Sequence, residues 1–221
     1  MNKPLTLAVL ISGNGSNLQA IMDAITDGLP AKIAVVISNR KDAYGLVRAQ
    51  QAGIPTHVLL SGDYPDRFSF DQALQNCLAS YQPDLIILAG FMRILGADFI
   101  SHFSQRILNI HPSLLPKYPG LHTHQQVLAQ GDQQHGATVH VVTEVLDGGP
   151  IIAYAALEVA PADTVESLQA KVHQLEHKLY PYVIRLFATQ HLQIGQDCVI
   201  LNGNLLPPQG LEYKEGIYGQ I

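Results

Sequence analysis

An amide, an imidazole and a carboxylate in this 221-residue chain have the types and placement that acyl transfer requires. Asn109 and His111 end the apolar run Arg106 to His111, and Asp147 lies in an Asp-Gly-Gly turn between two further apolar runs. Asn109 can donate a hydrogen bond to an oxygen that becomes negative in a tetrahedral intermediate. His111 can carry a proton between a nucleophile and a leaving group near neutral pH. Asp147, if the turn brings it close, would stabilise the imidazolium and raise the pKa of His111.

Asn109 and His111 alternate along one predicted strand, so both side chains project from one face at the strand end where ligands bind in α/β proteins. Each residue alone also has a structural interpretation. A lone histidine on an apolar strand is more often a core residue bonded to a backbone carbonyl, and Asp-Gly-Gly is a common turn. The combination of the three favours catalysis.

A metal site is the second chemical interpretation of this histidine-rich chain. The sequence holds 10 histidines, and His122, His124, His135 and His140 are near one another along the chain. Neither a His-Glu-x-x-His motif nor a carboxylate-rich ligand cluster accompanies them. We therefore expect no metal.

A glycine-containing segment, Gly13 to Leu18, follows the first predicted strand and opens the first helix. Free backbone N–H groups and the helix dipole attract an anion there, and phosphate is the natural ligand. Leu18 replaces the third glycine of the dinucleotide fingerprint and no acidic residue ends the second strand, which disfavours NAD. Arg40 alone is weak support for NADP, and the Gly-Lys-Ser/Thr of a P-loop is missing. The alternative is a tight turn with Ser16 or Asn17 as the helix N-cap.

The N-terminal half alternates short apolar strands with helical patterns. Strands that are apolar on both faces and alternate with helices predict a parallel sheet covered by helices. The predicted strands are Leu5 to Ile11, Lys32 to Ser38, Thr56 to Leu60 and Leu85 to Gly90, and helices begin at Leu18, Tyr44 and Arg67.

After Phe91 the pattern changes. A short helix from about Leu95 leads to the strand Arg106 to His111, a proline-rich loop from Pro112 to Gly120 and a helix from His122 to Gln130. The runs Ala137 to Thr143 and Pro150 to Val159 predict a hairpin that extends the sheet with antiparallel strands.

A long amphipathic helix is expected from Thr164 to Ala188, with cap-like residues at its start and Pro181 kinking or splitting it. The segment from Leu192 to Leu201 predicts a small edge hairpin, and residues from about Gln209 are expected to be loosely held. The fold class is α/β: a single-domain, Rossmann-like fold with a parallel N-terminal sheet half, antiparallel C-terminal strands and helices on both faces. The expected organisation is one domain, 1–221, with halves 1–90 and 91–210 and a tail 211–221.

Composition limits the partners. The chain is 47% hydrophobic and 14% charged with a formal net charge of -5, which is typical of a soluble globular protein. No basic run predicts nucleic-acid binding, and the apolar runs are too short for a membrane span. The two cysteines, Cys77 and Cys198, have no metal or redox spacing, which favours a reducing, cytoplasmic location. Cys77 is expected to be a buried structural thiol and not a nucleophile.

Four segments resemble the phosphoribosylglycinamide formyltransferase family, whose members use folate in purine synthesis. The resemblance extends from Leu7 to about Gly210. It is carried by Ser12 to Gln19, Ala89 to Leu95, Leu108 to Pro116 and Asp147 to Pro150.

The resemblance implies direct transfer of the formyl group of 10-formyltetrahydrofolate to the amino group of glycinamide ribonucleotide, without a covalent enzyme intermediate. It implies that Asn109 holds the formyl oxygen, that His111 assists proton transfer, and that Asp147 tunes His111 and helps to shuttle the proton through water. The ribonucleotide phosphate would lie on the loop residues Gly15, Ser16, Asn17, Leu18 and Gln19.

For the folate co-substrate, the resemblance implies a pterin pocket lined by Met92, Arg93, Ile94 and Leu95. Arg67 matches a residue that contacts the folate at its glutamate tail, and Glu176 matches one that contacts the ribonucleotide. The structural alternatives are an exposed helix arginine in a surface pair and a solvated helix glutamate.

Three other functions stay open. The same site could deliver formyl to water, as in formyltetrahydrofolate deformylase, which usually carries an extra N-terminal domain that we do not expect here. Methionyl-tRNA formyltransferase shares the catalytic domain but adds a C-terminal nucleic-acid-binding domain and a basic surface. A phosphate-binding module with a degenerate site is the alternative that is not an enzyme.

Overall fold

The computed structural model describes residues 3–195 and 197–214. The chain forms two compact units, Met1–Asn109 and Ile110–Ile221. The division falls inside strand β5 (Ile107–His111), the strand that carries the predicted amide and imidazole.

The first unit is built on a parallel sheet in the order β5-β4-β1-β2-β3. The other strands are β1 (Leu5–Ile11), β2 (Ala31–Ser38), β3 (Thr56–Val58) and β4 (Leu85–Leu88). All four strands predicted before residue 91 are present, with ends that differ by no more than two residues. Residues 7–11 of β1 are fully buried, which explains why the central strand is apolar on both faces.

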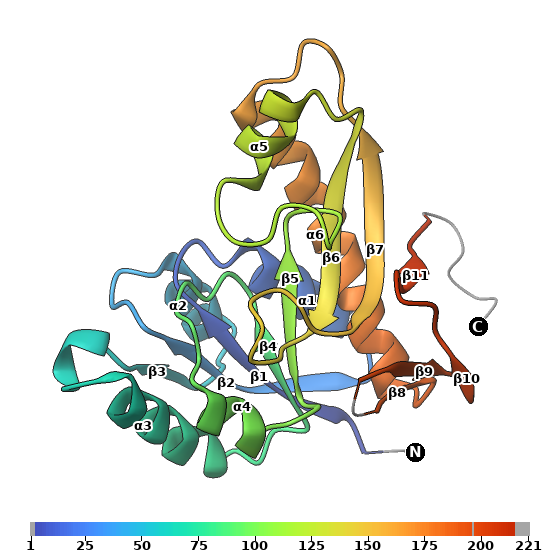
Figure 1. Cartoon of the computed structure of the whole chain (residues 1–221). Coiled ribbons are helices and arrows are strands. Elements are labelled where there is room, and N and C mark those ends of the chain that lie inside the picture. The colour runs from blue at the N-terminus through green and yellow to red at the C-terminus, as the bar shows by residue number, and fades with distance from the viewer. Residues whose placement is uncertain (1–2, 196, 215–221) are drawn as a thin grey trace. The chain divides into compact units, whose positions relative to one another are not determined.

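Helices cover both faces of this sheet. They are α1 (Ser16–Thr26), α2 (Tyr44–Gln51), α3 (Arg67–Ala79) and α4 (Ala97–His102), with a 3₁₀ turn, η1 (Ser61–Asp63). From β1 the chain adds β2 and β3 toward one edge of the sheet, and then adds β4 and β5 toward the opposite edge. Because the connections between parallel strands are right-handed, α1 and α2 lie on one face of the sheet and α3 and α4 on the other. The contacts between α1 and α2 and between α3 and α4 agree with this arrangement (Figure 1).

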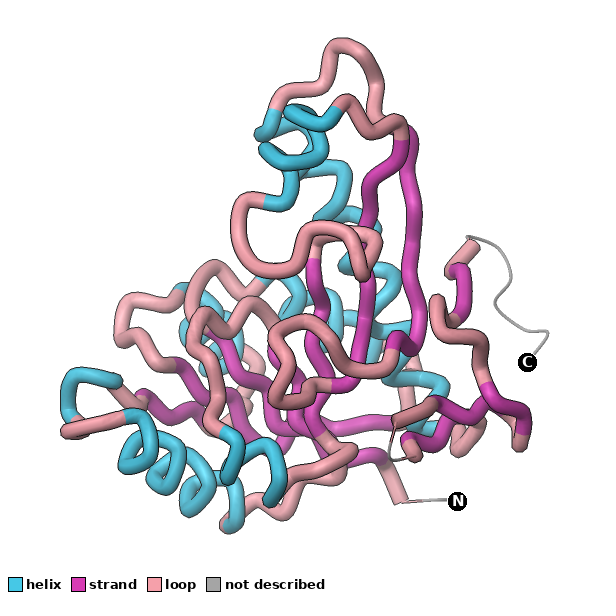
Figure 2. Tube along the Cα trace, in the orientation of Figure 1, coloured by secondary structure: helices cyan, strands magenta, loops and turns pink. Residues whose placement is uncertain are grey.

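The second unit contains a long antiparallel pair, β6 (Gln134–Val141) and β7 (Ile151–Glu158), which Figure 2 shows side by side. Helix α5 (Thr123–Gln130) precedes the pair, and helix α6 (Val165–Ala188) packs against both strands. The predicted antiparallel pair is confirmed. The connection between its strands, residues 142–150, is a loop long enough to carry functional groups.

Helix α6 begins with a capping box and stays continuous through Pro181. The Thr164 hydroxyl accepts a hydrogen bond from the Ser167 N–H at 3.2 Å, and the Ser167 hydroxyl accepts one from the Thr164 N–H at 2.9 Å. Of the two predicted effects of Pro181, a split of the helix is wrong, because α6 runs unbroken from Val165 to Ala188, and a kink stays a prediction. Tyr180 and Val183 on either side are fully buried, so packing offsets the backbone bond that proline cannot make.

The C-terminal segment is more ordered than its sequence predicts. The expected hairpin, β8 (Leu192–Ile194) with β9 (Val199–Leu201), gains a third strand, β10 (Asn204–Leu205). The prediction of a loose tail from Gln209 is wrong for its first residues, because β11 (Leu211–Glu212) pairs in parallel with β7 and the Tyr213 N–H donates to the Tyr154 carbonyl at 2.7 Å. The remainder of that prediction concerns residues 215–221, which lie outside the described residues. Among the helices that are described, none has the length and apolar character needed to cross a membrane.

Replacing Thr164 with alanine should lower the free energy of unfolding by about 1 kcal/mol, the usual contribution of an N-cap hydroxyl. Urea denaturation of the variant measures this change. Thr189→Ala, at the other end of α6, is the matched control because its hydroxyl donates only to carbonyls of the preceding turn. Equal losses in the two variants would contradict a capping role for Thr164.

Candidate active site

His111 ends β5 and is almost completely buried. Asn109 lies two residues earlier on the same strand and is partly exposed, so both side chains project from the same face of β5. The Nε2 atom of His111 lies 2.8 Å from the carbonyl oxygen of Tyr118. Because a carbonyl only accepts, Nε2 carries the hydrogen, and Nδ1 is the nitrogen left to take up or release a proton.

Asp147 places a carboxylate beside that Nδ1 atom. Its Oδ2 lies 3.5 Å from Nδ1 of His111 and accepts a hydrogen bond from the Gly120 N–H at 2.8 Å, while its Oδ1 lies 3.6 Å from Nε2 of His140. The Asp147 and His111 side chains are only 8% and 6% exposed. The carboxylate therefore lies between two imidazoles and is held by one backbone donor.

The loop that carries Asp147 is fixed by backbone geometry. Asp147 has a left-handed φ of 49°, a conformation that aspartate tolerates better than most residues. A Cβ at Gly149 would overlap the carbonyl oxygen of Val141, so only glycine fits there. The left-handed Asp147 and the glycine at position 149 are thus structural requirements for placing the carboxylate.

The predicted upward effect of Asp147 on the pKa of His111 is confirmed, but the net shift in that pKa is downward. Burial is the largest influence and lowers the pKa of His111 below 6.5, and the nearby His140 lowers it further, although Asp147 and the Tyr118 carbonyl both raise it. For Asp147, burial raises the pKa, but hydrogen bonds from His140 and Gly120 outweigh it and hold the pKa below its usual value. At neutral pH the site therefore pairs a neutral imidazole with an ionised carboxylate.

His140, Tyr118 and Gly120 were missed in the sequence analysis as parts of this site. His140 was considered only as a possible metal ligand. Tyr118 and Gly120 act through backbone atoms, for which the sequence carries no signal.

Two further histidines, the buried His135 and the partly exposed His124, form a pair in this unit. Nδ1 of His124 lies 2.9 Å from Nε2 of His135. Burial, followed by the charge of His124, lowers the pKa of His135 to about 4. Among the described residues, no three His, Cys, Asp or Glu side chains are arranged to hold a metal ion.

In the first unit, the predicted anion loop is held by close contact between two backbones. Gly15 has a left-handed φ of 74° and is the N-cap of α1, without a side-chain cap. A Cβ on Gly15 would lie 2.6 Å from Cα of Gly45 in α2, and the Gly45 N–H donates to the Gly13 carbonyl at 3.1 Å. The alternative in which Ser16 or Asn17 is the N-cap is therefore wrong.

The side chains of the loop differ in what they offer a ligand. Leu18 is a core residue with no exposed surface, so only its backbone is available, whereas Ser16 and Gln19 are partly exposed. Asn17 is 9% exposed. The amino end of α1 thus keeps its backbone donors and the Ser16 hydroxyl for an anion.

The segment predicted to line the pterin pocket follows β4. Met92 and Ile94 are 72% and 62% exposed, whereas Leu95 is 5% exposed. The guanidinium of Arg93 stacks over the Phe70 ring at 4.2 Å from its centroid. Two large apolar side chains are therefore free to meet a flat ligand while their neighbours anchor the segment.

Two side chains that we did not single out as functional from the sequence hold this segment in place. The Ser12 hydroxyl accepts a hydrogen bond from the Met92 N–H at 2.7 Å and donates to Asn39 at 2.6 Å. The Asp71 carboxylate accepts one from the Gly96 N–H at 2.8 Å. Burial raises the pKa of Asp71, against the opposing charges of Arg93 and Arg67.

The structure decides between some of the alternatives at the remaining predicted residues. Arg67 is exposed at the first position of α3 and its charge lowers the pKa of Asp71, so the folate contact and the surface pair both stay predictions. Glu176 lies on α6 and is 4% exposed, which excludes a solvated helix glutamate. Cys77 is only partly buried, not fully as predicted, and burial raises the pKa of its thiol, which disfavours a nucleophile.

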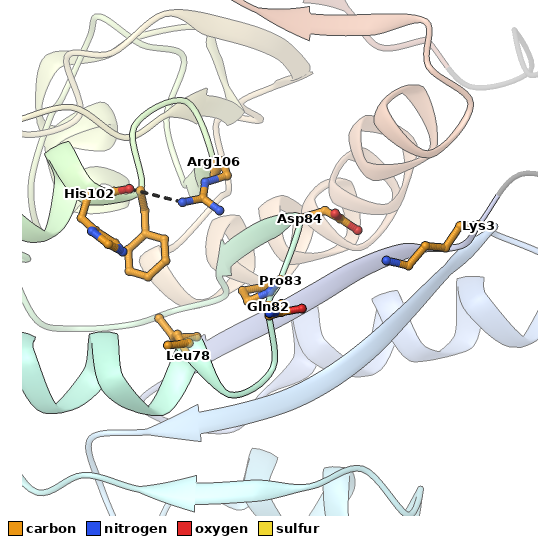
Figure 3. A pocket seen from close by; sticks show the side chains of 9 residues that line it. Lys3, Leu78, Gln82, Pro83, Asp84, His102 and Arg106 are labelled. Atoms are coloured by element: carbon orange, nitrogen blue, oxygen red, sulfur yellow. Dashed lines mark hydrogen bonds between the residues drawn. The ribbon is translucent and has the colours of Figure 1, made fainter.

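Two hollows in the first unit differ in their relation to these residues. The larger, about 470 Å³, lies at the amino ends of β4 and β5 and is lined by residues that include Lys3, Asp84 and Arg106 (Figure 3). It contains none of the predicted site residues. The smaller, about 270 Å³, includes Arg67 and Asp71 in its wall.

Residues 5–184 match the formyl transferase family, and the chain belongs to it. The chain is 50% identical to the phosphoribosylglycinamide formyltransferase of Escherichia coli (strain K12) over 96% of this chain and 100% of that protein. It is 48% identical to the Haemophilus influenzae enzyme of the same name, over 92% of this chain and 97% of that one. A solved structure of phosphoribosylglycinamide formyltransferase from Coxiella burnetii has a TM-score of 0.93 and 53% identity, covering 96% of this chain and all of that chain. The predicted α/β formyltransferase fold is confirmed.

The His124–His135 pair makes stability sensitive to acid. Because folding lowers the pKa of His135 from 6.5 to about 4, the unfolded chain binds the proton more tightly, and stability falls as pH drops from 6.5 toward 4. The loss assignable to His135 is of the order of 3 kcal/mol. Urea unfolding of His135→Gln at pH 7.5 and pH 5 should show a flatter pH dependence than the parent, and an unchanged slope would contradict this account.

Proposed function

We propose that this protein transfers the formyl group of 10-formyltetrahydrofolate to the amino group of glycinamide ribonucleotide, a step of de novo purine biosynthesis. The observation that carries the proposal is the pairing of His111 with Asp147, with Asn109 two residues earlier on the same strand, in a chain 50% identical to a phosphoribosylglycinamide formyltransferase along nearly its whole length. Both partners are small molecules, and no nucleic acid, membrane or metal takes part. Two free cysteines agree with a cytoplasmic location.

The chemistry follows from what each side chain can exchange. The amine of the ribonucleotide attacks the formyl carbon, and Asn109 donates a hydrogen bond to the formyl oxygen as it becomes negative. The neutral Nδ1 of His111 takes the proton that the attacking amine loses, and the Asp147 carboxylate stabilises the resulting imidazolium. The proton then goes to N10 as the bond between carbon and N10 breaks, with Asp147 assisting through water. The products are the formylated amide and tetrahydrofolate.

The two substrates are assigned to the segments that suit their chemistry. The ribonucleotide phosphate lies on Gly15, Ser16, Asn17, Leu18 and Gln19 at the amino end of α1, and Glu176 contacts the same substrate. The pterin lies against Met92, Arg93, Ile94 and Leu95, and Arg67 binds the glutamate tail. With Arg67 and Glu176 as exceptions, residues 1–90 would thus serve the ribonucleotide and 91–210 the folate and the chemistry, within one formyltransferase domain.

The test of this function is the loss of 10-formyltetrahydrofolate, followed by absorbance with and without glycinamide ribonucleotide. Turnover that requires the ribonucleotide supports the transferase. Equal turnover without it indicates a deformylase. Turnover only with charged initiator tRNA would indicate the tRNA formyltransferase, and no turnover with any acceptor would favour a binding module.

Asn109→Ala should reduce kcat by about 10² to 10³ through loss of one oxyanion donor. His111→Ala should reduce it by about 10² to 10⁴ through loss of the proton carrier. Steady-state kinetics on purified variants with unchanged circular dichroism measures both. Exposed His102→Ala is the control, and turnover near the parent value in either active-site variant would refute its role.

The pH profile tests how Asp147 and His111 are coupled. Because the pKa of His111 is lowered by burial and its neutral form accepts the proton, kcat/KM should fall only below pH 6.5. Asp147→Asn removes a negative charge that raises the pKa of His111. The fall of kcat/KM at acid pH, the acid limb of the profile, should therefore move to still lower pH, and kcat should decrease. A limb that moves to higher pH would contradict the assignment. Asp27→Asn, an exposed carboxylate at the end of α1, should leave the limb in place.

A further inference from the structure

Arg48 of α2 is the side chain most closely tied to the predicted anion loop. Its Nε donates to the Asn14 carbonyl at 3.0 Å, its Nη2 to the Asn14 side-chain oxygen at 3.0 Å, and its Nη1 to the Gln19 side-chain oxygen at 3.2 Å. The guanidinium also lies 4.9 Å from the centroid of the Tyr44 ring. One side chain therefore spans the loop on both sides of Gly15.

Arg48 and Gly45 act on the loop from the same face of α2, because residues three apart in a helix are neighbours. Gly45 contacts the loop through its backbone, by close approach to Gly15 and by its hydrogen bond to Gly13. Arg48 reaches the residues on either side of that contact. One face of α2, formed by Gly45 and Arg48, thus supports the anion loop.

The charge of Arg48 is not balanced by a protein carboxylate. Within the described part of the chain all its hydrogen-bond acceptors are neutral and it forms no ion pair. Arg40, at the end of β2, is different, since its guanidinium pairs with Asp42 at 2.8 Å. An uncompensated guanidinium close to the positive end of α1 is unfavourable until an anion arrives, and a phosphate dianion offsets both charges.

We infer that Arg48 is a positioning residue for the ribonucleotide phosphate: it holds Asn14 and Gln19 so that the Gly13 to Asn17 loop keeps its anion-binding shape, and it supplies positive charge beside that loop. This inference rests on the proposed function. It adds a residue that neither the motif nor the family resemblance singled out, since Arg48 is 34 residues from Asn14 in the sequence.

The test compares Arg48→Met with Arg48→Lys in the full chain. Arg48→Met should raise the KM for glycinamide ribonucleotide by about tenfold or more, the effect of losing one hydrogen bond to a charged group. The KM for 10-formyltetrahydrofolate and the kcat at saturation should stay within about twofold of the parent, because Arg48 supports only the phosphate loop. Arg48→Lys keeps the positive charge but loses the paired hydrogen bonds to Asn14. Its KM for the ribonucleotide should therefore lie between the values of the parent and of Arg48→Met.

Arg106→Met is the matched control. It removes the same charge from the first unit, but Arg106 lies in the hollow at the amino ends of the strands and donates to the His102 carbonyl (Figure 3). Its KM for the ribonucleotide should match the parent value. Equal changes in the two methionine variants would mean that net charge alone is responsible and would overturn the inference.

A binding measurement separates this inference from the proposed function. Inorganic phosphate and ribose 5-phosphate should raise the Tm of the parent and of Arg106→Met, and should raise that of Arg48→Met much less. If the parent shows no transfer to the ribonucleotide but keeps this Arg48-dependent shift, the proposed function fails and the phosphate role of Arg48 stands. If Arg48→Met lowers Tm but keeps the full phosphate shift and ribonucleotide KM, Arg48 serves stability alone and the inference is wrong.

Discussion

The candidate active site depends on the buried carboxylate of Asp147, which needs hydrogen-bond or charge partners at both of its oxygen atoms. Asp147 meets His111 at 3.5 Å, His140 at 3.6 Å and the Gly120 N–H at 2.8 Å, and its side chain is 8% exposed. A buried charge without such partners would be costly. The surrounding loops are therefore constrained: one must direct the Gly120 N–H inward, another must turn through a left-handed Asp147, and Gly149 must pass close to Val141. The chemistry at His111 follows from this balance, because burial keeps the imidazole neutral while Asp147 stands ready to stabilise its protonated form.

In the first unit, the two segments proposed to bind ligands are also held in place by residues distant in sequence. An anion site and a flat apolar site both need loops that keep backbone N–H groups or apolar side chains free for a ligand. Such loops lack regular hydrogen bonding of their own. Ser12 and Asp71 secure the segment after β4, and Gly45 and Arg48 secure the loop after β1. In each case a partner distant in sequence completes the bonding of the loop and leaves its ligand-facing groups free.

The sequence was sufficient for the parts of the fold that periodicity and strand–helix alternation determine. The run Leu5–Ile11, the helix starts at Tyr44 and Arg67 and the pair β6 and β7 follow from local pattern and burial. The predicted split at Pro181 is wrong because tertiary packing of α6 overrides a local preference, and β11 was missed because two residues carry no periodic signal. The residue types of the candidate site and the upward effect of Asp147 on the pKa of His111 were visible in the sequence, but the net downward shift of that pKa was not. That net shift depends on burial and on His140, and both arise only when distant segments pack together.

The most direct test of this account is the protonation state of His111, measured by ¹⁵N NMR of the histidine side chains near pH 7 with the signal assigned through His111→Gln. The structure predicts a neutral ring with hydrogen on Nε2, bonded to the Tyr118 carbonyl, and a bare Nδ1 facing Asp147. Asp147→Asn should leave the ring neutral and alter the Nδ1 shift most. A doubly protonated ring, or hydrogen on Nδ1 with a bare Nε2, would contradict the account of a buried neutral base with a carboxylate poised beside it.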